Sequence, residues 1–321
     1  MNGENELWVR VAERSRAANN IVAFELVGEK GEVLPPFTAG AHIDLHLPGG
    51  VIRQYSLVNS PKERHHYVVA VLRDANGRGG SLVMHDTVQV GDVIKIGPPK
   101  NCFELATTSR HKILIAGGIG ITPFLSMMDV LYTNGQSFEL HYSAKKKESA
   151  AFIDELSGSK FSEKIKIYLT AESEQRLNIL ETLAKAPADS EVYACGPPRL
   201  VEATVAAAKE LGWPDDRIKW EAFSGRHIDV STNSAFQVKI ASSGKSYSVP
   251  ADKTIAEILS ENRIPVELSC AQGVCGTCLT RVIEGVPDHR DIYLTPAEQL
   301  RNDQMLICCS RSLSSELVLD L

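Results

Sequence analysis

The stretch SCAQGVCGTCL, residues 269–279, places Cys270, Cys275 and Cys278 in the spacing CxxxxCxxC, and a distant Cys308 follows it. This spacing is the plant-type ligand run of a [2Fe-2S] cluster. Four thiolates must converge on two irons, so three ligands come from one tight loop and the fourth from a returning segment. The sequence therefore predicts an electron-transfer centre near the C-terminus.

Glycine lies between the ligand positions, at Gly273 and Gly276. Glycine takes positive φ at little cost, so the backbone can approach inorganic sulfur closely and donate N–H groups to it. Zinc or a disulfide pair is the alternative. Structural zinc usually uses paired CxxC knuckles, and disulfides need an oxidising compartment. Both alternatives fit this pattern less well than a cluster.

The fourth ligand is ambiguous because Cys309 directly follows Cys308. We expect the segment MLICCSR to be a strand, in which neighbouring side chains point to opposite faces. Only one of the two cysteines can then face the cluster.

Composition restricts the class of protein. A chain of 321 residues is long for one core and suggests two or three domains. The net charge of −6 argues against a nucleic-acid partner. The sequence begins without an apolar signal core, and no apolar run approaches the roughly 20 residues that cross a bilayer. We expect a cytoplasmic protein with no membrane segment, whose seven cysteines are reduced or bind metal.

The rhythm of apolar residues changes along the chain and predicts three folds. Residues 1–105 carry short β-like runs broken by Gly and Pro, which indicates an antiparallel β-barrel. In residues 106–226 buried strands alternate with helix-like stretches, which favours an α/β, doubly wound parallel sheet. A polar linker at 227–234 precedes a small α+β domain at 235–321 that holds the cysteine loop.

Two features of the first region suit a phosphate-bearing planar ligand. Arg53 and Tyr55 lie two apart on a strand and so share a face, where a guanidinium can bind phosphate and a ring can stack. Gly79, Gly80 and Ser81 precede an apolar helical stretch whose first N–H groups favour an anion. Taken singly, the first feature is an ordinary surface arginine beside a strand tyrosine, and the second a glycine-rich turn. Their combination with a nucleotide-type domain favours a ligand site.

Two strand-to-helix turns in the second region suit a dinucleotide. The first, GGIGITP, lets a pyrophosphate approach the backbone of Gly117, Gly118 and Gly120, although it is not a GxGxxG motif. The second follows the buried strand EVYAC and consists of Cys195, Gly196 and Pro197. Cys195 is either an inert buried thiol or a small group beside the reactive nicotinamide.

The choice between NADH and NADPH depends on charges that oppose each other. Glu172 follows a strand and could accept from a ribose 2′-hydroxyl while repelling a 2′-phosphate. Lys145, Lys146 and Lys147 could instead hold that phosphate, although a solvated charge run is their ordinary role. The balance favours NADH.

Taken together, the motifs RxYS, GRGGS, GGIGITP, CGPPR, WEAFS and CxxxxCxxC resemble the phthalate dioxygenase reductase family over nearly the whole chain. DHRD at 288–291 and CxSR at 308–311 narrow the resemblance further. It implies an FMN-binding barrel at 1–105, an NAD-binding domain at 106–226 and a β-grasp ferredoxin domain at 235–321.

The resemblance also implies roles for individual residues. Arg53 would bind the FMN phosphate together with Gly79, Gly80 and Ser81. Tyr55 would flank the isoalloxazine ring, and Ser56 would bond near its N5. Thr122 would lie beside flavin and nicotinamide, Phe223 would cover the other ring face, and CxSR selects Cys308 as the fourth cluster ligand. The expected catalytic residues are Ser56, Thr122, Cys195 and Phe223, and the expected cofactor-binding set further includes Gln54, Val71, Leu72, Arg73 and Leu82.

The implied function is electron transfer from NADH through FMN and a [2Fe-2S] cluster to a Rieske-type oxygenase. Flavin suits this task because nicotinamide moves two electrons at once and the cluster moves one. Two alternatives stay open: a stand-alone electron carrier or redox-sensing module, and an NADPH-dependent reductase that serves a cytochrome P450. We expect a monomer with no nucleic-acid or membrane partner.

Overall fold

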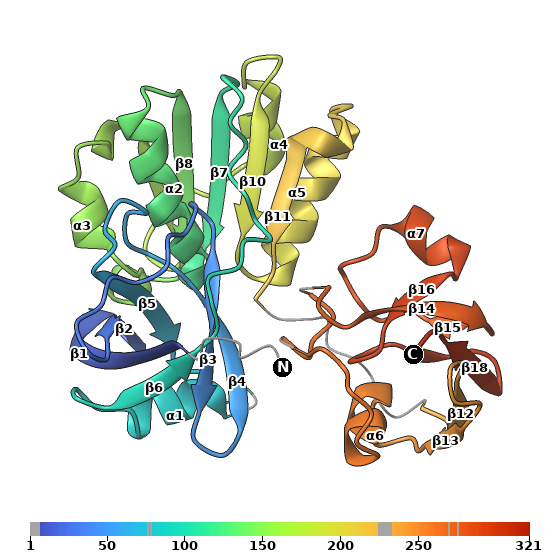
Figure 1. Cartoon of the computed structure of the whole chain (residues 1–321). Helices are drawn as coiled ribbons and strands as arrows, with labels where there is room; N and C mark the ends of the chain where they lie inside the picture. Colours follow the sequence, from blue (N-terminus) through green and yellow to red (C-terminus); the bar gives the residue numbers. More distant parts are fainter. Residues whose placement is uncertain (1–6, 76, 78, 224–232, 269, 275) are drawn as a thin grey trace. The chain divides into compact units, whose positions relative to one another are not determined.

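The computed structural model describes all residues except 1–6, 76, 78, 224–232, 269 and 275. The chain forms two compact units, Met1–Phe223 and Ser224–Leu321 (Figure 1). Each unit has hydrophobic cores of its own. Among the described helices, none has both the length and the apolar character needed to span a membrane.

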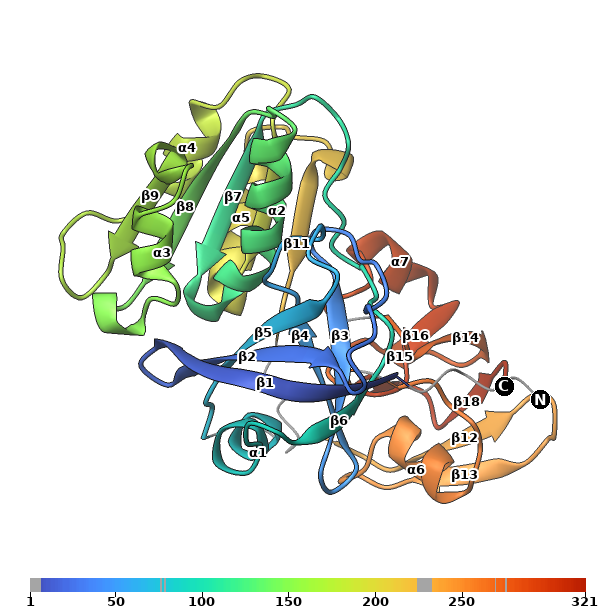
Figure 2. The ribbon, with the colours of Figure 1, turned by 60° about the vertical axis from the view of Figure 1, so that its left-hand side comes forward.

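The first sheet of the larger unit is antiparallel, with strand order β4-β3-β6-β1-β2-β5 (Figure 2). A bridge between Leu57 and Val69 connects the chain just after β4 to β5, so the two ends of the sheet meet and close a barrel. Its interior is apolar, with Val9, Val11 and Phe24 fully buried. The elements are β1 (Leu7–Ala18), β2 (Ile21–Gly28), β3 (His42–Leu47), β4 (Val51–Ser56), β5 (His66–Leu72), α1 (Gly80–Asp86) and β6 (Val93–Ile96). The predicted antiparallel barrel is confirmed.

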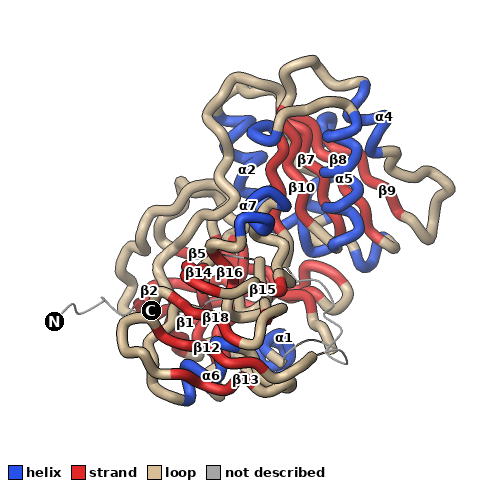
Figure 3. The backbone as a smooth tube through the Cα atoms, turned by 90° about the vertical axis from the view of Figure 1, so that its right-hand side faces the viewer, coloured by secondary structure: helices blue, strands red, loops and turns tan. Residues whose placement is uncertain are grey.

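The second sheet is parallel, with strand order β11-β10-β7-β8-β9. Its side chains alternate between two cores, because Leu114 of β7 packs in one cluster with residues of α2 while Ile113 packs in another with residues of α5. In Figure 3 the strands of this sheet, in red, lie among the helices α2, α4 and α5, in blue. The elements are β7 (Lys112–Gly117), η1 (Gly118–Ile121), α2 (Thr122–Thr133), β8 (Phe138–Ala144), α3 (Ile153–Ser157), β9 (Ile165–Leu169), α4 (Ile179–Ala184), β10 (Glu191–Cys195), α5 (Pro198–Glu210) and β11 (Ile218–Glu221), with short 3-10 turns η2 (Lys147–Ser149), η3 (Ser162–Lys164) and η4 (Asp215–Arg217). The predicted doubly wound sheet is confirmed, and β11 is a strand that the sequence analysis did not identify.

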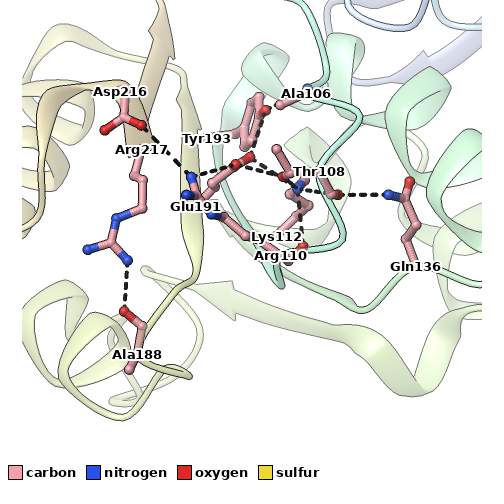
Figure 4. A network of polar contacts seen from close by, with 10 residues as sticks. All are labelled: Ala106, Thr108, Arg110, Lys112, Gln136, Ala188, Glu191, Tyr193, Asp216 and Arg217. Carbon is pink, nitrogen blue, oxygen red and sulfur yellow. Dashed lines mark hydrogen bonds and ion pairs between the residues drawn. The ribbon is translucent and has the colours of Figure 1, made fainter.

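A buried ion pair lies at the amino-terminal edge of this parallel sheet (Figure 4). Lys112 Nζ lies 3.1 Å from Glu191 Oε2, and both side chains are almost fully buried. Burial alone would raise the pKa of Glu191, but hydrogen bonds from Thr108 and Lys112 lower it below its ordinary value. The pair lies where β7 and β10 begin, at the edge opposite the carboxyl ends of the strands, where ligands of such sheets bind.

The barrel and the parallel sheet share a core within the larger unit. Ala70 and Phe103 from the barrel side pack in one cluster with Phe124 and Met127 of α2. Polar contacts reinforce the joint, since Ser60 Oγ donates to Asp129 Oδ2 at 2.6 Å. A shared core of this kind fixes the placement of one sheet against the other.

The smaller unit is built on a mixed sheet, with strand order β13-β12-β18-β14-β16. Strands β12 and β18 are parallel and the other pairs antiparallel. The helix α6 begins with a capping box between Thr254 and Glu257. The elements are β12 (Phe236–Ile240), β13 (Ser246–Val249), α6 (Ile255–Glu261), β14 (Leu279–Glu284), β15 (Pro287–Asp288), α7 (Pro296–Arg301), β16 (Gln304–Leu306), β17 (Arg311–Ser312) and β18 (Glu316–Leu319). The predicted α+β class is confirmed.

One local prediction for this unit is wrong. Strand β16 ends at Leu306, so Cys308 and Cys309 lie in a turn rather than on a strand. The rule that neighbours point to opposite faces therefore does not apply to them. The exact domain boundaries at 105/106 and 234/235 stay predictions.

Candidate functional site

The chain order of the parallel sheet reverses between β7 and β10, and both glycine-rich turns lie at this switch point. An added Cβ on Gly120 would lie 2.3 Å from the carbonyl oxygen of Cys195 and 2.6 Å from the nitrogen of Gly196. An added Cβ on Gly117 would lie 2.7 Å from Pro197 Cδ. The two turns can approach this closely because Gly117 and Gly120 have no side chain. Ligands of open α/β sheets bind at such a point, beyond the carboxyl ends of the strands.

A buried carboxyl group that the sequence analysis missed lies beside Cys195. Glu221 of β11 pairs in register with Cys195 of β10, and none of the described residues makes a hydrogen bond with its Oε2 atom. Burial raises the pKa of Glu221 to about 8, so the carboxyl is mostly protonated at neutral pH and can donate. Burial, together with the nearby Glu221, raises the pKa of the Cys195 thiol well above its ordinary value. The signal available in the sequence was the single acid in the short apolar segment IKWEAF.

Thr122 and Phe223 flank the same edge of the sheet. Thr122 is buried at the start of α2, and its Oγ1 donates to the carbonyl of Ile119 at 3.0 Å. Phe223 lies two residues after the end of β11, and 38% of it is exposed. Strand β5 of the barrel lies against η1, which brings the barrel to this turn. Their expected roles beside the flavin stay predictions.

Arg53 and the start of α1 meet on the barrel. An added Cβ on Gly80 would lie 2.5 Å from Arg53 Cγ and 2.6 Å from its Nε, so the arginine stem lies directly over this glycine. Gly79 precedes the helix with φ +81°, a conformation that glycine adopts freely. Ser81 Oγ accepts from the Asp74 N–H at 3.1 Å and thereby ties the loop to the helix. The structure thus brings together the residues predicted to hold a phosphate.

The neighbours of Arg53 on β4 are held by the adjacent strand β3. Gln54 Nε2 lies 3.0 Å from His42 Nε2, and Ser56 is buried. Tyr55 pairs in register with Ile43, and burial raises the pKa of Tyr55 to about 12. The phenol is neutral at physiological pH, and its expected stacking on a flavin stays a prediction.

The end of β5 is braced against α1. The Val71 carbonyl lies 2.8 Å from His85 Nε2, while Arg73 and Asp86 form an exposed ion pair at 2.9 Å. Leu72, between them, is 40% exposed, and Leu82 of α1 is half-buried. The brace fixes the backbone of residues 71–73, where a flavin contact is expected.

Glu172, which is expected to favour NADH, lies close to the lysines at 145–147, which could favour NADPH. Glu172 Oε1 accepts from the Lys147 N–H at 3.0 Å, and the Ala171 N–H donates to the carbonyl of Lys145. Lys147 Nζ in turn lies 3.2 Å from Asp154, and Lys146 Nζ lies 3.8 Å from Glu148. Acidic groups thus face two of the three lysines.

The cysteine loop of the smaller unit is shaped by glycine. Gly273 has φ +73° and Gly276 has φ +74°, as the close wrap predicted. An added Cβ on Gly276 would lie 2.3 Å from the Tyr293 ring. The Gln272 N–H donates to Cys270 Sγ at 3.4 Å, which is the kind of contact that tunes a cluster.

Two of the predicted cluster ligands, Cys278 and Cys308, lie close together. The Cys308 thiol interacts with those of Cys278 and Cys309 and with the backbone of Gly273. The hydrogen bond with Cys278 acts to lower the pKa of Cys308, but the contact with Cys309 and burial raise it to about 12. Cys275 lies outside the described residues. Among the described residues, no three His, Cys, Asp or Glu side chains form a group that could hold a metal ion, and the ligand roles of these cysteines stay predictions.

Comparisons with known proteins agree with this geometry. Residues 238–313 match the family described as "2Fe-2S iron-sulfur cluster binding domain", and residues 114–206 match "Oxidoreductase NAD-binding domain". With a barrel attached to the second, the chain is an NAD-dependent flavin and [2Fe-2S] oxidoreductase.

Two of the similar proteins align with this chain over nearly its full length. Vanillate O-demethylase oxidoreductase of Pseudomonas sp. (strain HR199 / DSM 7063) is 43% identical, over 95% of this chain and 96% of that protein. The solved structure of phthalate dioxygenase reductase has a TM-score of 0.81 at 37% identity and covers 99% of this chain and 98% of that one. A type IV self-sufficient cytochrome P450 monooxygenase also has a TM-score of 0.81, at 35% identity, over 98% of this chain but 41% of that one. The chain belongs to the phthalate dioxygenase reductase-like family.

Proposed function

We propose that this protein accepts a hydride from NADH at an FMN site and passes single electrons through a [2Fe-2S] cluster to a Rieske-type oxygenase component. The observation that carries the proposal is the meeting of Gly120 with Cys195 at the switch point, in one chain with the cysteine loop. The named relatives support the oxygenase partner, since one is a vanillate O-demethylase oxidoreductase and another a phthalate dioxygenase reductase.

The barrel residues would bind and orient the flavin. Arg53 would bind the FMN phosphate, because its guanidinium lies over Gly80 at the start of α1. Tyr55 would stack on the ring, and Ser56 would donate to its edge near N5. When bound, FMN supplies the conversion from two-electron to one-electron transfer.

The parallel sheet would place the nicotinamide ring. The glycines of the two turns would admit the pyrophosphate to the backbone, and Thr122 and Phe223 would border the ring. Cys195 would present a small, neutral face, since its pKa is raised by burial. Glu221, protonated near neutral pH, would donate a hydrogen bond into the same space. Glu172 would accept from the adenine ribose and favour NADH.

The smaller unit would hold the cluster through Cys270, Cys275, Cys278 and Cys308. Its glycine backbone would lie against the inorganic sulfurs, and the Gln272 N–H would donate to a ligand sulfur.

The test is reconstitution of the purified, cofactor-loaded protein with an aromatic-acid Rieske oxygenase and either NADH or NADPH. We expect NADH-dependent product formation that requires both proteins. Product with NADPH alone would contradict the assignment of Glu172, and absence of any NADH-dependent electron transfer to a one-electron acceptor would favour a carrier or sensor module.

A P450 partner is the second candidate because of the 35% identity to the self-sufficient monooxygenase. A P450 that accepts electrons from this protein faster than the Rieske oxygenase does would favour it.

A further inference from the structure

The turn after β16 carries two cysteines that are both turned into the smaller unit. Cys308 is 5% exposed and Cys309 is 6% exposed. The Cys309 N–H donates to the carbonyl of Leu306, so the chain reverses directly after the strand. In a turn, adjacent side chains are free to point to the same side, unlike on a strand.

Both sulfurs reach the same glycine of the ligand loop. An added Cβ on Gly273 would lie 2.5 Å from Cys309 Sγ, while the Gly273 backbone interacts with the Cys308 thiol. Gly273 lies between Cys270 and Cys278, at the centre of the stretch that would wrap the cluster. Cys309 Sγ therefore lies against the ligand loop, as Cys308 does.

Among the described residues, the Cys309 sulfur contacts the Cys308 thiol and makes hydrogen bonds with Leu306 and Ser310. These hydrogen bonds are long, at 3.8 Å to the carbonyl of Leu306 and 3.8 Å to Ser310 Oγ. Ser310 Oγ has better partners, since it accepts from the Arg290 N–H at 3.2 Å and donates to Asp291 Oδ1 at 3.4 Å. Releasing Cys309 from these contacts costs little.

We infer that Cys309 is a reserve sulfur ligand of the cluster and takes the fourth ligand position when Cys308 is absent. The inference rests on the cluster ligation proposed above. In the exchange, the Cys309 thiol gives its proton to solvent and its sulfur bonds to the iron that Cys308 would have bound. The oxidation states of the irons do not change, and no other reactant is needed.

The experiment compares alanine variants, because alanine offers no ligand atom. Cys308→Ala, Cys309→Ala and the double variant are purified anaerobically, and iron per chain and the electron paramagnetic resonance of the dithionite-reduced protein are measured. Cys102→Ala, an exposed cysteine of the larger unit, is the matched control. We expect Cys308→Ala to keep about half or more of the wild-type iron with a shifted signal, and the double variant to lose roughly tenfold. Cys309→Ala and the control keep full iron.

Equal loss of iron in Cys308→Ala and the double variant would overturn the inference. If Cys308→Ala is not recovered folded, Cys308→Ser preserves the side-chain volume. An all-cysteine signal in that variant supports Cys309 as the ligand, while an oxygen-ligated signal or a folded, iron-free protein overturns it. A wild-type protein without iron would instead refute the proposed function, so the two failures are distinguishable.

Discussion

Two glycine-rich loops of the chain, GGIGITP at 117–123 and the cysteine loop at 269–279, are expected to approach a cofactor in different ways. The turn GGIGITP, which is expected to bind the dinucleotide, depends on close backbone contact, because Gly120 fits against the backbone of Cys195 and Gly196 with no room for a side chain. The cysteine loop also contains glycines at positive φ, but the atoms expected to bind its cofactor are side-chain sulfurs.

The two loops differ in what fixes the positions of their binding groups. Packed strands of a shared core preform the first site before any ligand binds. The second depends on its ligand, as metal sites commonly do, since the thiols are protonated until iron replaces the protons. Substitutions should therefore affect the first loop through geometry and the second through ligand chemistry.

The largest effect is expected from removing a cluster ligand. Cys278→Ala leaves the buried sulfur position empty, and Cys278 has no adjacent cysteine in the sequence. We expect iron content to fall roughly tenfold or more and NADH-dependent reduction of cytochrome c to be lost. Ferricyanide, which can accept electrons directly from flavin, should still be reduced. Unchanged iron content would refute the ligand role of Cys278.

The next effect is expected at the preformed turn. Gly120→Ala forces a Cβ to within 2.3 Å of a carbonyl oxygen, so one backbone must move. We expect a stability loss of about 1–3 kcal/mol and a roughly hundredfold slower reduction of the flavin by NADH in stopped flow.

The matched control is Gly118→Ala in the same turn. Gly118 has φ +55° but no atom within 4 Å of an added Cβ. The expected cost is about 1 kcal/mol of backbone strain. A Gly118 variant as slow as the Gly120 variant would show that the close approach to Cys195 is not the reason.

A third effect concerns the pH dependence set by Glu221. Its pKa rises from an ordinary 4.5 to about 8 on folding, so between these values the unfolded chain releases a proton that the folded chain keeps. The free energy of unfolding contributed by this group therefore falls as pH rises from 4.5 to about 8. In Glu221→Gln, the free energy of unfolding measured with urea should fall less over this pH range than it does in the wild-type protein. An identical pH profile in both proteins would contradict the burial of the carboxyl.

The smallest effect is expected at the exposed Glu172. Its carboxylate accepts from the Lys147 N–H, and its removal would weaken the discrimination against a 2′-phosphate. We expect Glu172→Ala to raise the NADPH-to-NADH ratio of kcat/KM by about fivefold, or roughly 1 kcal/mol. The exposed Glu174 of the same loop serves as control and should change nothing.

Sequence patterns predicted the features that depend on local geometry. The motifs that contain Arg53 and Gly80 were both recognised in the sequence, although their separation along the chain did not predict the contact between them that the fold creates. The positive φ of Gly273 and Gly276 followed from the need for a close wrap. The parallel sheet followed from the alternation of buried strands and helices.

The misses have tertiary causes. Strand β11 has only four residues, and its local sequence does not show that it pairs with β10. Glu221 was therefore not recognised as a neighbour of Cys195. Cys308 and Cys309 were expected on a strand, because an apolar run does not show where a strand gives way to a turn. Both errors concerned residues that lie at the sites.

The most direct test of the account is an anaerobic titration of the purified protein with NADH, followed by visible absorbance and electron paramagnetic resonance. The account predicts that NADH bleaches the flavin and that a reduced [2Fe-2S] signal then appears, with about two irons per chain. A protein that binds zinc in place of iron, or whose iron centre stays oxidised while the flavin is fully reduced, would contradict it.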